Sequence, residues 1–376
     1  MSNFKSPVFE KRRYDIEYLR IFAVLLLIPF HCAMVFFSYE SFYVKSSSSH
    51  FLLDYFVFFL SPWHMPLLFI IAGISTFYAL QKRTWNQYIA ERTKRLLVPF
   101  VFSMLFIVPP QPYFAYLKTH PDGSLLNFIR QYFFHIQGDF TGYTGFFTPA
   151  HLWFILYLYF YSIISVPLFL NLKKHSQKIE NYIANYIFLF LYPVIIGLVE
   201  QLPSPVSKNP FYYYTYFFIG FFIVSNPKIE QFIRKNRFLL FLAGMTTMII
   251  YLSLIKFSLT FEKYSSSDVL FYILRRFNVW FWLLFILGYG EKYLNSPMRI
   301  LPYASEMSYP FYILHQTIIV LLAYYIISWN LNVGLVFFVL SVLSFSVTLV
   351  IYHFLIRKYK ILRFLFGMKG VIRFGE

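Results

Sequence analysis

Residues 51–80, FLLDYFVFFLSPWHMPLLFIIAGISTFYAL, decide the class of this protein. A bilayer core about 30 Å thick is crossed by roughly 20 apolar residues of α-helix. This run is too long for one straight span, and Pro62 and Pro66 remove backbone hydrogen-bond donors near its middle. The sequence therefore predicts a membrane helix that is kinked or interrupted at these prolines.

The rest of the chain has the same character. Of its 376 residues, 59% are hydrophobic and only 13% are charged, whereas a soluble domain carries roughly 25% charged residues. Such a chain has more apolar surface than one core can hide, so part of that surface faces lipid. This excludes a water-soluble enzyme, a secreted disulfide scaffold and a disordered chain. A single cysteine, Cys32, excludes an intramolecular disulfide, and we expect no metal site.

We predict an all-α integral membrane protein with about ten transmembrane helices. The expected spans are Tyr18–Phe37, Phe51–Leu80, Leu96–Leu117, Ala150–Leu170, Asn181–Glu200, Phe211–Val224, Phe238–Ile255, Asp268–Gly288, Met307–Ser328 and Val333–Ile356.

The distribution of positive charge predicts the orientation. With the N-terminus inside, 24 of the 33 lysines and arginines fall in cytoplasmic segments, as positive-inside topology requires. Both termini are then cytoplasmic, and the net charge of +17 is explained without nucleic acid. The predicted organisation is a cytoplasmic segment 1–17, a ten-span membrane domain 18–356 and a basic cytoplasmic tail 357–376. Within the domain, an aromatic outer loop 111–149 is expected to form an ordered cap.

Arg20 and His31 are the first ionisable groups expected at membrane depth. Eleven residues correspond to 20° more than three helical turns, so both side chains lie on one face, about 16 Å apart. A charged side chain in a spanning helix is costly and is therefore a functional candidate. The alternative for Arg20 is an anchor on lipid phosphates, and for His31 a structural hydrogen bond.

Other candidates lie at similar depth. His64 lies between the two prolines, where it either satisfies the broken backbone or contacts substrate. Arg275 and Arg276 point about 100° apart, and we expect at least one of them to face the pocket of His31 and His64 because few acids are available to neutralise it. His151, at the outer mouth of its span, and His315, in the cytoplasmic half of its span, lie at other depths. Both stand alone by spacing, and a lone histidine is more often structural.

Five ordered motifs resemble the membrane acyltransferase-3 superfamily, multi-spanning enzymes that modify surface glycans and lipids. They are the arginine–ten residues–histidine spacing of Arg20 and His31, the apolar run Met65–Gly73 with Ala72 in place of the usual serine, the basic stretch Arg92–Pro99, His151–Phe154 and Ser308–His315. The Trp-His-Met-Pro and His-Leu-Trp-Phe segments look most like the group of periplasmic glucan succinyltransferases (glucan biosynthesis protein C).

The resemblance implies an acyl-CoA donor from the cytoplasm and a hydroxyl acceptor, on a glycan or lipid-linked sugar, at the outer face. The family's catalytic histidine and arginine map onto His31 and Arg20. A histidine suits this chemistry as a general base or as a carrier of the acyl group, and the sequence leaves both open.

Arginines also suit the phosphates of the donor. We expect Arg83, Arg92 and Arg95 to bind it together with Arg20, and His64, His151, Arg275 and Arg276 to line an acceptor or acyl pocket.

The leading hypothesis is therefore an acyl-CoA-dependent membrane O-acyltransferase. Acetyl-CoA or succinyl-CoA would be a cosubstrate, and no tightly bound cofactor is expected. The expected partners are the lipid bilayer of the plasma (inner) membrane, acyl-CoA and the glycan, with no nucleic acid, and a homo-oligomer is left open. The alternative is a multi-span transporter or exporter of a glycan or acylated substrate.

Overall fold

The computed structural model describes residues 12–134, 141–143, 147–174, 186–204, 206–224, 227–257, 265–329 and 331–369, with only the backbone of 172–174 and 186–188. These residues form helices and contain no strand. The helices are α1 (Tyr14–Leu25), α2 (Leu27–Met34), α3 (Phe51–Leu60), α4 (His64–Lys82), α5 (Trp85–Arg92), α6 (Val98–Phe106), α7 (Pro110–Thr119), α8 (Leu125–Tyr132), α9 (Trp153–Lys174), α11 (Tyr186–Glu200), α12 (Pro210–Ile223), α13 (Pro227–Lys235), α14 (Arg237–Lys256), α15 (Ser266–Tyr293), α16 (Leu301–Ile326), α17 (Val333–Val350) and α18 (Lys360–Leu365).

The all-α membrane fold is confirmed. Among the described residues, eight helical segments are long and apolar enough to cross a membrane. The two remaining expected spans correspond to α11, with 15 described residues, and α12, with 14. Part of the former, residues 181–185, lies outside the described residues, so the count of ten and the position of the termini stay predictions.

The expected interruption of the second span is confirmed. Helix α3 ends at Leu60 and α4 begins at His64, with a three-residue turn between them. Pro62 lies in this turn, and Pro66 lies in the first turn of α4, where a missing amide proton costs least.

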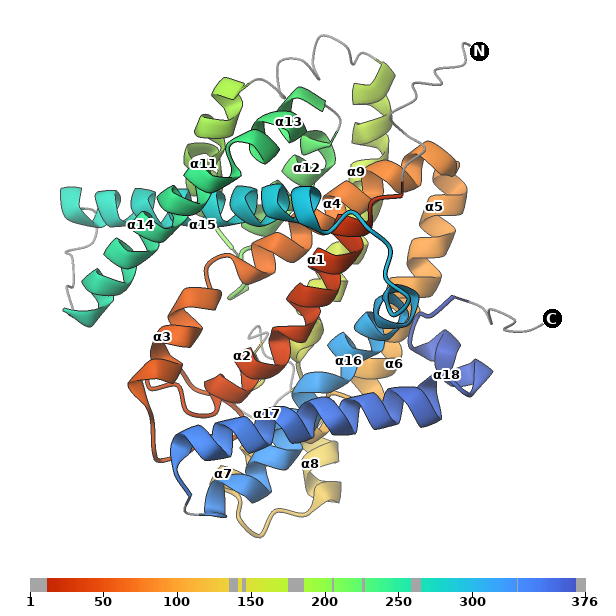
Figure 1. Cartoon of the computed structure of the whole chain (residues 1–376). Helices are drawn as coiled ribbons and strands as arrows, with labels where there is room; N and C mark the ends of the chain where they lie inside the picture. The colour runs from red at the N-terminus through yellow and green to blue at the C-terminus, as the bar shows by residue number, and fades with distance from the viewer. Residues whose placement is uncertain are drawn as a thin grey trace.

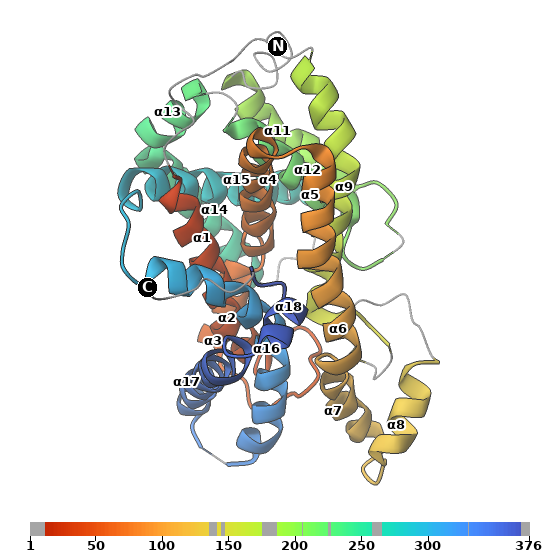
Figure 2. The same ribbon diagram turned by 90° about the vertical axis from the view of Figure 1, so that its right-hand side faces the viewer.

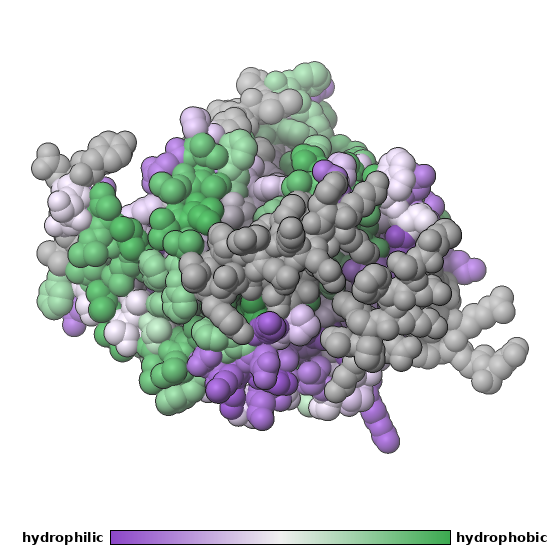
Figure 3. Space-filling view, turned by 90° about the horizontal axis from the view of Figure 1, so that it is seen from above, coloured by the Kyte–Doolittle hydropathy of each residue, from purple (hydrophilic) through white to green (hydrophobic). Residues whose placement is uncertain are grey.

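Helix α1 lies in the middle of the bundle, against α4, α15 and α16 (Figures 1 and 2). Helices α14 and α17 lie at the periphery, where Leu239, Ile249, Phe338 and Val342 are exposed. Viewed from above, broad apolar areas flank a patch of hydrophilic residues (Figure 3). An outer surface of this kind is stable only in contact with lipid.

A close helix crossing joins α4 to α12. A Cβ added to Gly73 would lie 2.0 Å from the Phe217 carbonyl oxygen, and one added to Gly220 would lie 2.3 Å from the Ile70 carbonyl oxygen. Two glycines therefore bring the helix backbones into direct contact, as small residues do between membrane helices.

An ionic cluster joins the start of α1 to α4 and α13. The Arg13 guanidinium donates hydrogen bonds to Asp15, to the Tyr78 hydroxyl at 3.0 Å and to Glu230 at 2.5 Å. Burial lowers the pKa of Arg13, but the hydrogen bond to Asp15 and the charges of Asp15 and Glu230 outweigh it, so the pKa is raised overall. Arg13 therefore remains charged and fixes this end of α1.

The expected outer cap contains α7 and α8 in its described part. Tyr116, Phe128 and Tyr132 pack together between these helices and are almost completely buried. Residues 135–140 and 144–146 of this loop lie outside the described residues.

We expect Gly73→Ala to destabilise the protein by roughly 1–3 kcal/mol, because the new methyl group overlaps the Phe217 carbonyl oxygen. Thermal unfolding of the purified protein in detergent measures the change. Gly244→Ala in α14 is the matched control, since its Cβ would lie 3.6 Å from the nearest atom. Equal melting temperatures for both variants would contradict the close crossing.

Candidate active site

Four sequence-predicted arginines meet at one cavity. Arg20, Arg83, Arg92 and Arg95 line a cavity of about 280 Å³. They come from α1, the end of α4, α5 and the turn that follows α5. We call this side of the molecule the basic end. The charge distribution predicts that it faces the cytoplasm.

The cavity has an excess of positive charge. Glu91 is the only acidic residue among its lining residues, and it pairs with Arg83 at 2.6 Å and with Arg95 at 3.2 Å. Arg20 donates to the Ser75 hydroxyl at 2.8 Å, and Arg92 lies 4.8 Å above the Tyr88 ring. Neither Arg20 nor Arg92 has a carboxylate within 4.0 Å among the described residues, so both can bind an anionic ligand.

A π-helical turn positions the last two arginines. Residues Thr93–Leu97 are π-helical, and the Val98 amide donates to the Thr93 carbonyl. Pro99 has no amide proton for the Arg95 carbonyl, which explains why the regular pattern fails here. Gly367 lies against this carbonyl in a left-handed conformation, with φ at 64°, and accepts a hydrogen bond from Arg95 Nε at 3.3 Å.

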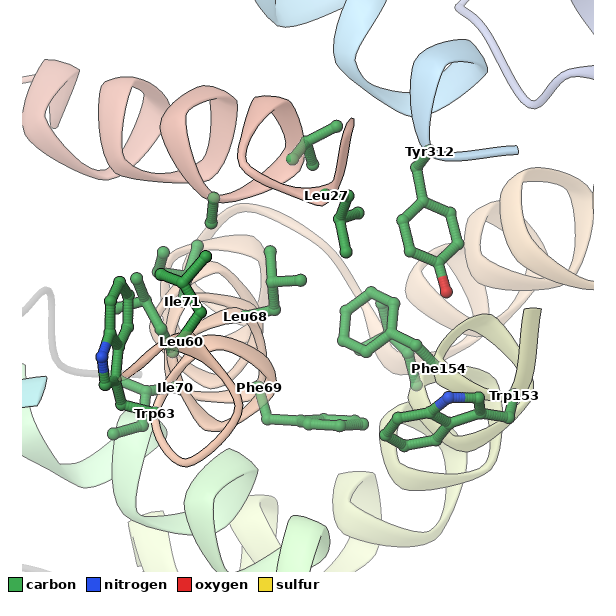
Figure 4. Close-up of a cluster of buried hydrophobic side chains, with 14 of the residues drawn as sticks. Leu27, Leu60, Trp63, Leu68, Phe69, Ile70, Ile71, Trp153, Phe154 and Tyr312 are labelled. Atoms are coloured by element: carbon green, nitrogen blue, oxygen red, sulfur yellow. The ribbon is translucent and has the colours of Figure 1, made fainter. Parts of the chain in front are cut away.

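An apolar layer closes the inner end of the cavity. Leu68, Phe154 and Tyr312 line it there, and their side chains gather in the same region of Figure 4. The rings of Phe154 and Tyr312 are 5.5 Å apart. The Tyr312 ring is also 5.9 Å from the His315 ring, so a single layer of side chains separates the cavity from the histidines.

Beyond this layer three histidines form a cluster. The His315 ring lies 5.2 Å from the His31 ring and 5.1 Å from the His151 ring. His31 is half-buried, whereas His151 and His315 are buried. At the end away from the cavity, the Phe42 ring stacks on His31 at 6.0 Å, and Tyr143 lies against Phe42.

Hydrogen bonding divides the histidines into two kinds. Nε2 of His151 donates to the Ile313 carbonyl at 2.9 Å, and its Nδ1 accepts from Gln111 at 3.4 Å. Nε2 of His64 donates to the Ala23 carbonyl at 2.6 Å, which ties α4 to α1. His31 has no hydrogen-bond partner among the described residues. Both ring nitrogens of His151 are therefore held by the fold, whereas Nδ1 of His31 is not.

These side chains do not form a metal site. No group of three or more histidine, cysteine, aspartate or glutamate residues in the described parts of the chain is arranged to hold a metal ion.

Comparison with known proteins identifies the family of this chain. Residues 13–353 match the family described as "Acyltransferase domain", which is acyltransferase family 3. This chain belongs to the acyltransferase-3 family.

Curated relatives of this acyltransferase-3 protein are named "Glucans biosynthesis protein C". The protein of Escherichia coli K12 is 23% identical over 394 residues, covering 98% of this chain and 97% of the relative. The protein of Escherichia coli O1:K1 / APEC is also 23% identical, over 398 residues, with the same coverage. No solved structure gives a significant match.

In this acyltransferase-3 protein, a nearby serine replaces the hydroxyl that Ala72 lacks. Ala72 and Ser75 both line the cavity. The Ser75 hydroxyl donates to the Ile71 carbonyl at 2.7 Å and accepts from Arg20 at 2.8 Å. A polar contact for Arg20 is thus retained without a hydroxyl at position 72.

His315 is the site residue that the sequence analysis missed. The span that carries it was expected to begin at Met307, but α16 begins at Leu301. The six extra residues place His315 about 9 Å deeper, level with the other histidines. The Ser308–His315 motif did point to this residue, but sequence spacing alone did not place it beside His31.

Arg276 lies in a different environment from the one expected. It is 3% exposed and pairs with Glu200 at 2.8 Å, and it also donates to the Tyr212 hydroxyl at 2.9 Å. The sequence analysis expected few acids at this depth, but the end of α11 places one of them, Glu200, against Arg276. Arg275 is half-buried, and its Nε has no partner among the described residues. The described contacts join neither arginine to His31 or His64.

We expect Arg276→Gln to lower the free energy of unfolding by roughly 3 kcal/mol, because it leaves Glu200 without its cation. Thermal unfolding of the two single variants and of the double variant Arg276→Gln/Glu200→Gln tests this expectation. The double variant should lose less stability than the sum of the stability losses of the two single variants. Strict additivity would show that the two side chains are not coupled.

Proposed function

We propose that this protein transfers an acyl group from acyl-CoA at the basic end of the bundle to a hydroxyl of a glycan or lipid-linked sugar at the opposite face. The family supports acyl transfer. The donor, the acceptor and the location in the plasma (inner) membrane are our inference.

One observation carries the proposal. The cavity lined by Arg20, Arg83, Arg92 and Arg95 is also lined by Tyr312, whose ring lies against His315, and His315 lies against His31. Arginine is well suited to phosphate because its planar guanidinium donates two parallel hydrogen bonds. CoA carries phosphates at one end of a long arm and the reactive thioester at the other. The two ends of the site therefore fit the two ends of the donor.

The acceptor is inferred from the relatives and from the position of His31. Proteins named for glucan biosynthesis cover almost the whole chain, which supports a glucan or a related saccharide. His31 lies next to Phe42, on the side away from the arginines. An acceptor that reaches His31 from this side would not compete with CoA for the cavity.

His31 can act in two ways. As a general base it takes the proton of the acceptor hydroxyl while the oxygen attacks the thioester carbon. As a nucleophile it first carries the acyl group as an acyl-imidazole. Rapid acid quenching followed by peptide mass spectrometry distinguishes the routes, because only the second leaves the acyl mass on the peptide that contains His31.

The decisive experiment uses purified protein in liposomes with radiolabelled acetyl-CoA or succinyl-CoA and a glucan oligosaccharide. Label on the saccharide or on the protein supports acyl transfer. Flux of the saccharide without consumption of acyl-CoA would support the transporter alternative and overturn the proposal.

We expect His31→Gln to lower kcat by about 10²-fold to 10⁴-fold, since it removes the titratable nitrogen from the reaction. The assay is steady-state transfer from the labelled donor, and a melting temperature close to that of the wild type shows that the fold is intact. Turnover near the wild-type rate would make His31 a structural residue.

We expect Arg92→Gln to raise the KM for acyl-CoA by roughly ten-fold or more, because one charge-assisted hydrogen bond to phosphate is lost. Arg20→Lys keeps the charge but loses the bidentate geometry, so it should raise the same KM. Arg299→Gln, an exposed arginine outside the cavity, is the control. If the donor KM is the same in all three variants, the cavity does not bind CoA.

A further inference from the structure

Two buried imidazole nitrogens in the histidine cluster are left without hydrogen-bond partners. They are Nδ1 of His31 and Nε2 of His315, among the described residues. The two ring centroids are 5.2 Å apart, with 40° between the ring planes. A buried polar atom without a partner costs about 1–3 kcal/mol. Two such atoms on adjacent rings therefore require a common explanation.

The backbone of α16 fixes the proton position on His315. Nδ1 of this residue lies 2.7 Å from the Tyr312 carbonyl oxygen and 3.2 Å from the Phe311 carbonyl oxygen. A carbonyl oxygen only accepts hydrogen bonds, so Nδ1 carries the proton. Nε2 of neutral His315 then has a free lone pair and can accept a hydrogen bond.

We propose that His315 is a positioning residue for His31. Its Nε2 accepts the Nδ1 proton of His31, directly or through one water, so that the lone pair on Nε2 of His31 is free to react. The catalytic meaning of this inference rests on the proposed acyl transfer, whereas the tautomer that it assigns to His31 does not.

Alternative partners for His31 are already occupied. His151 uses both ring nitrogens, with Ile313 and Gln111, and His64 donates to Ala23. A carboxylate often orients a histidine, but a carboxylate at this depth would add a buried charge at considerable cost. A second neutral imidazole supplies the same acceptor without that charge.

The proposed tautomer serves both catalytic routes. In the base route, Nε2 of His31 takes the proton of the acceptor hydroxyl and the oxygen forms an ester bond to the thioester carbon. The carbon–sulfur bond breaks, and the CoA thiolate takes the proton back from His31. In the nucleophile route, Nε2 bonds to the same carbon, and the Nδ1 proton passes to His315 as the carbon–sulfur bond breaks and the thiolate leaves. The acceptor oxygen then attacks this carbon and the carbon–nitrogen bond breaks. His315 returns its proton to Nδ1 of His31, and the hydroxyl proton goes to the thiolate.

Two substitutions of similar size separate positioning from folding. In His315→Asn, the side-chain amide can still donate to the Tyr312 carbonyl, but no acceptor remains at the position of Nε2. In His315→Gln, the longer side chain can place its amide oxygen near that position. His353→Asn is the control, since His353 is an exposed histidine that contacts Tyr303 at 3.1 Å and lies outside both the cavity and the cluster.

We expect His315→Asn to lower kcat about 100-fold with little change in the donor KM, because His31 loses the partner that selects its tautomer. His315→Gln should recover at least a tenth of the wild-type kcat, and His353→Asn should not change it. Unchanged kcat in His315→Asn, or equally low kcat in the Asn and Gln variants, would overturn the proposal.

A spectroscopic measurement tests the tautomer without any turnover. The measurement is NMR of the protein labelled with ¹⁵N-histidine in detergent. We expect the His31 signal, assigned from its loss in His31→Gln, to be that of an Nδ1-protonated imidazole. In His315→Asn the same signal should become that of the Nε2-protonated tautomer. An Nε2-protonated His31 in the wild type would overturn the inference. If the tautomer is as proposed but no acyl-CoA supports transfer, the proposed function fails and the positioning role of His315 stands.

Discussion

The backbone contact between α4 and α12 is the constraint on which the site depends. Gly73 and Gly220 allow the two helices to touch, and this fixes the rotation of α4. With that rotation, Ala72 and Ser75 face the cavity and His64 reaches the Ala23 carbonyl of α1. The helix that carries Arg20 is therefore positioned by a crossing that contains no catalytic residue.

The hydrogen bonds of polar side chains inside the bundle are informative because this is a membrane protein. Polar groups at membrane depth are expensive, so most of them are paired inside the bundle. His64, His151 and Arg276 all follow this rule. Among the histidines of the described part of the chain, His31 and His315 each keep one buried ring nitrogen without a partner. This difference distinguishes His31 and His315 from His64 and His151, whose hydrogen bonds hold the helices together.

The sequence was sufficient to predict the helical class from the length of its apolar runs and the break near Pro62 from proline chemistry. It also predicted, from charge, that Arg20 lies with the basic stretch. It could not place His315 beside His31, because such proximity depends on where α16 begins and how it crosses α1. It also missed Glu200 as the partner of Arg276, because depth estimates along separate helices do not show which helices are neighbours.

Tyr312 links the two halves of the site. Its ring closes the cavity on the side of the arginines, its hydroxyl donates to the His151 carbonyl, and its own carbonyl accepts from His315. A residue that lines the arginine cavity thus also orients one of the histidines. The carbonyl belongs to the α16 backbone, so the hydrogen bond that fixes His315 does not depend on the position of the Tyr312 ring.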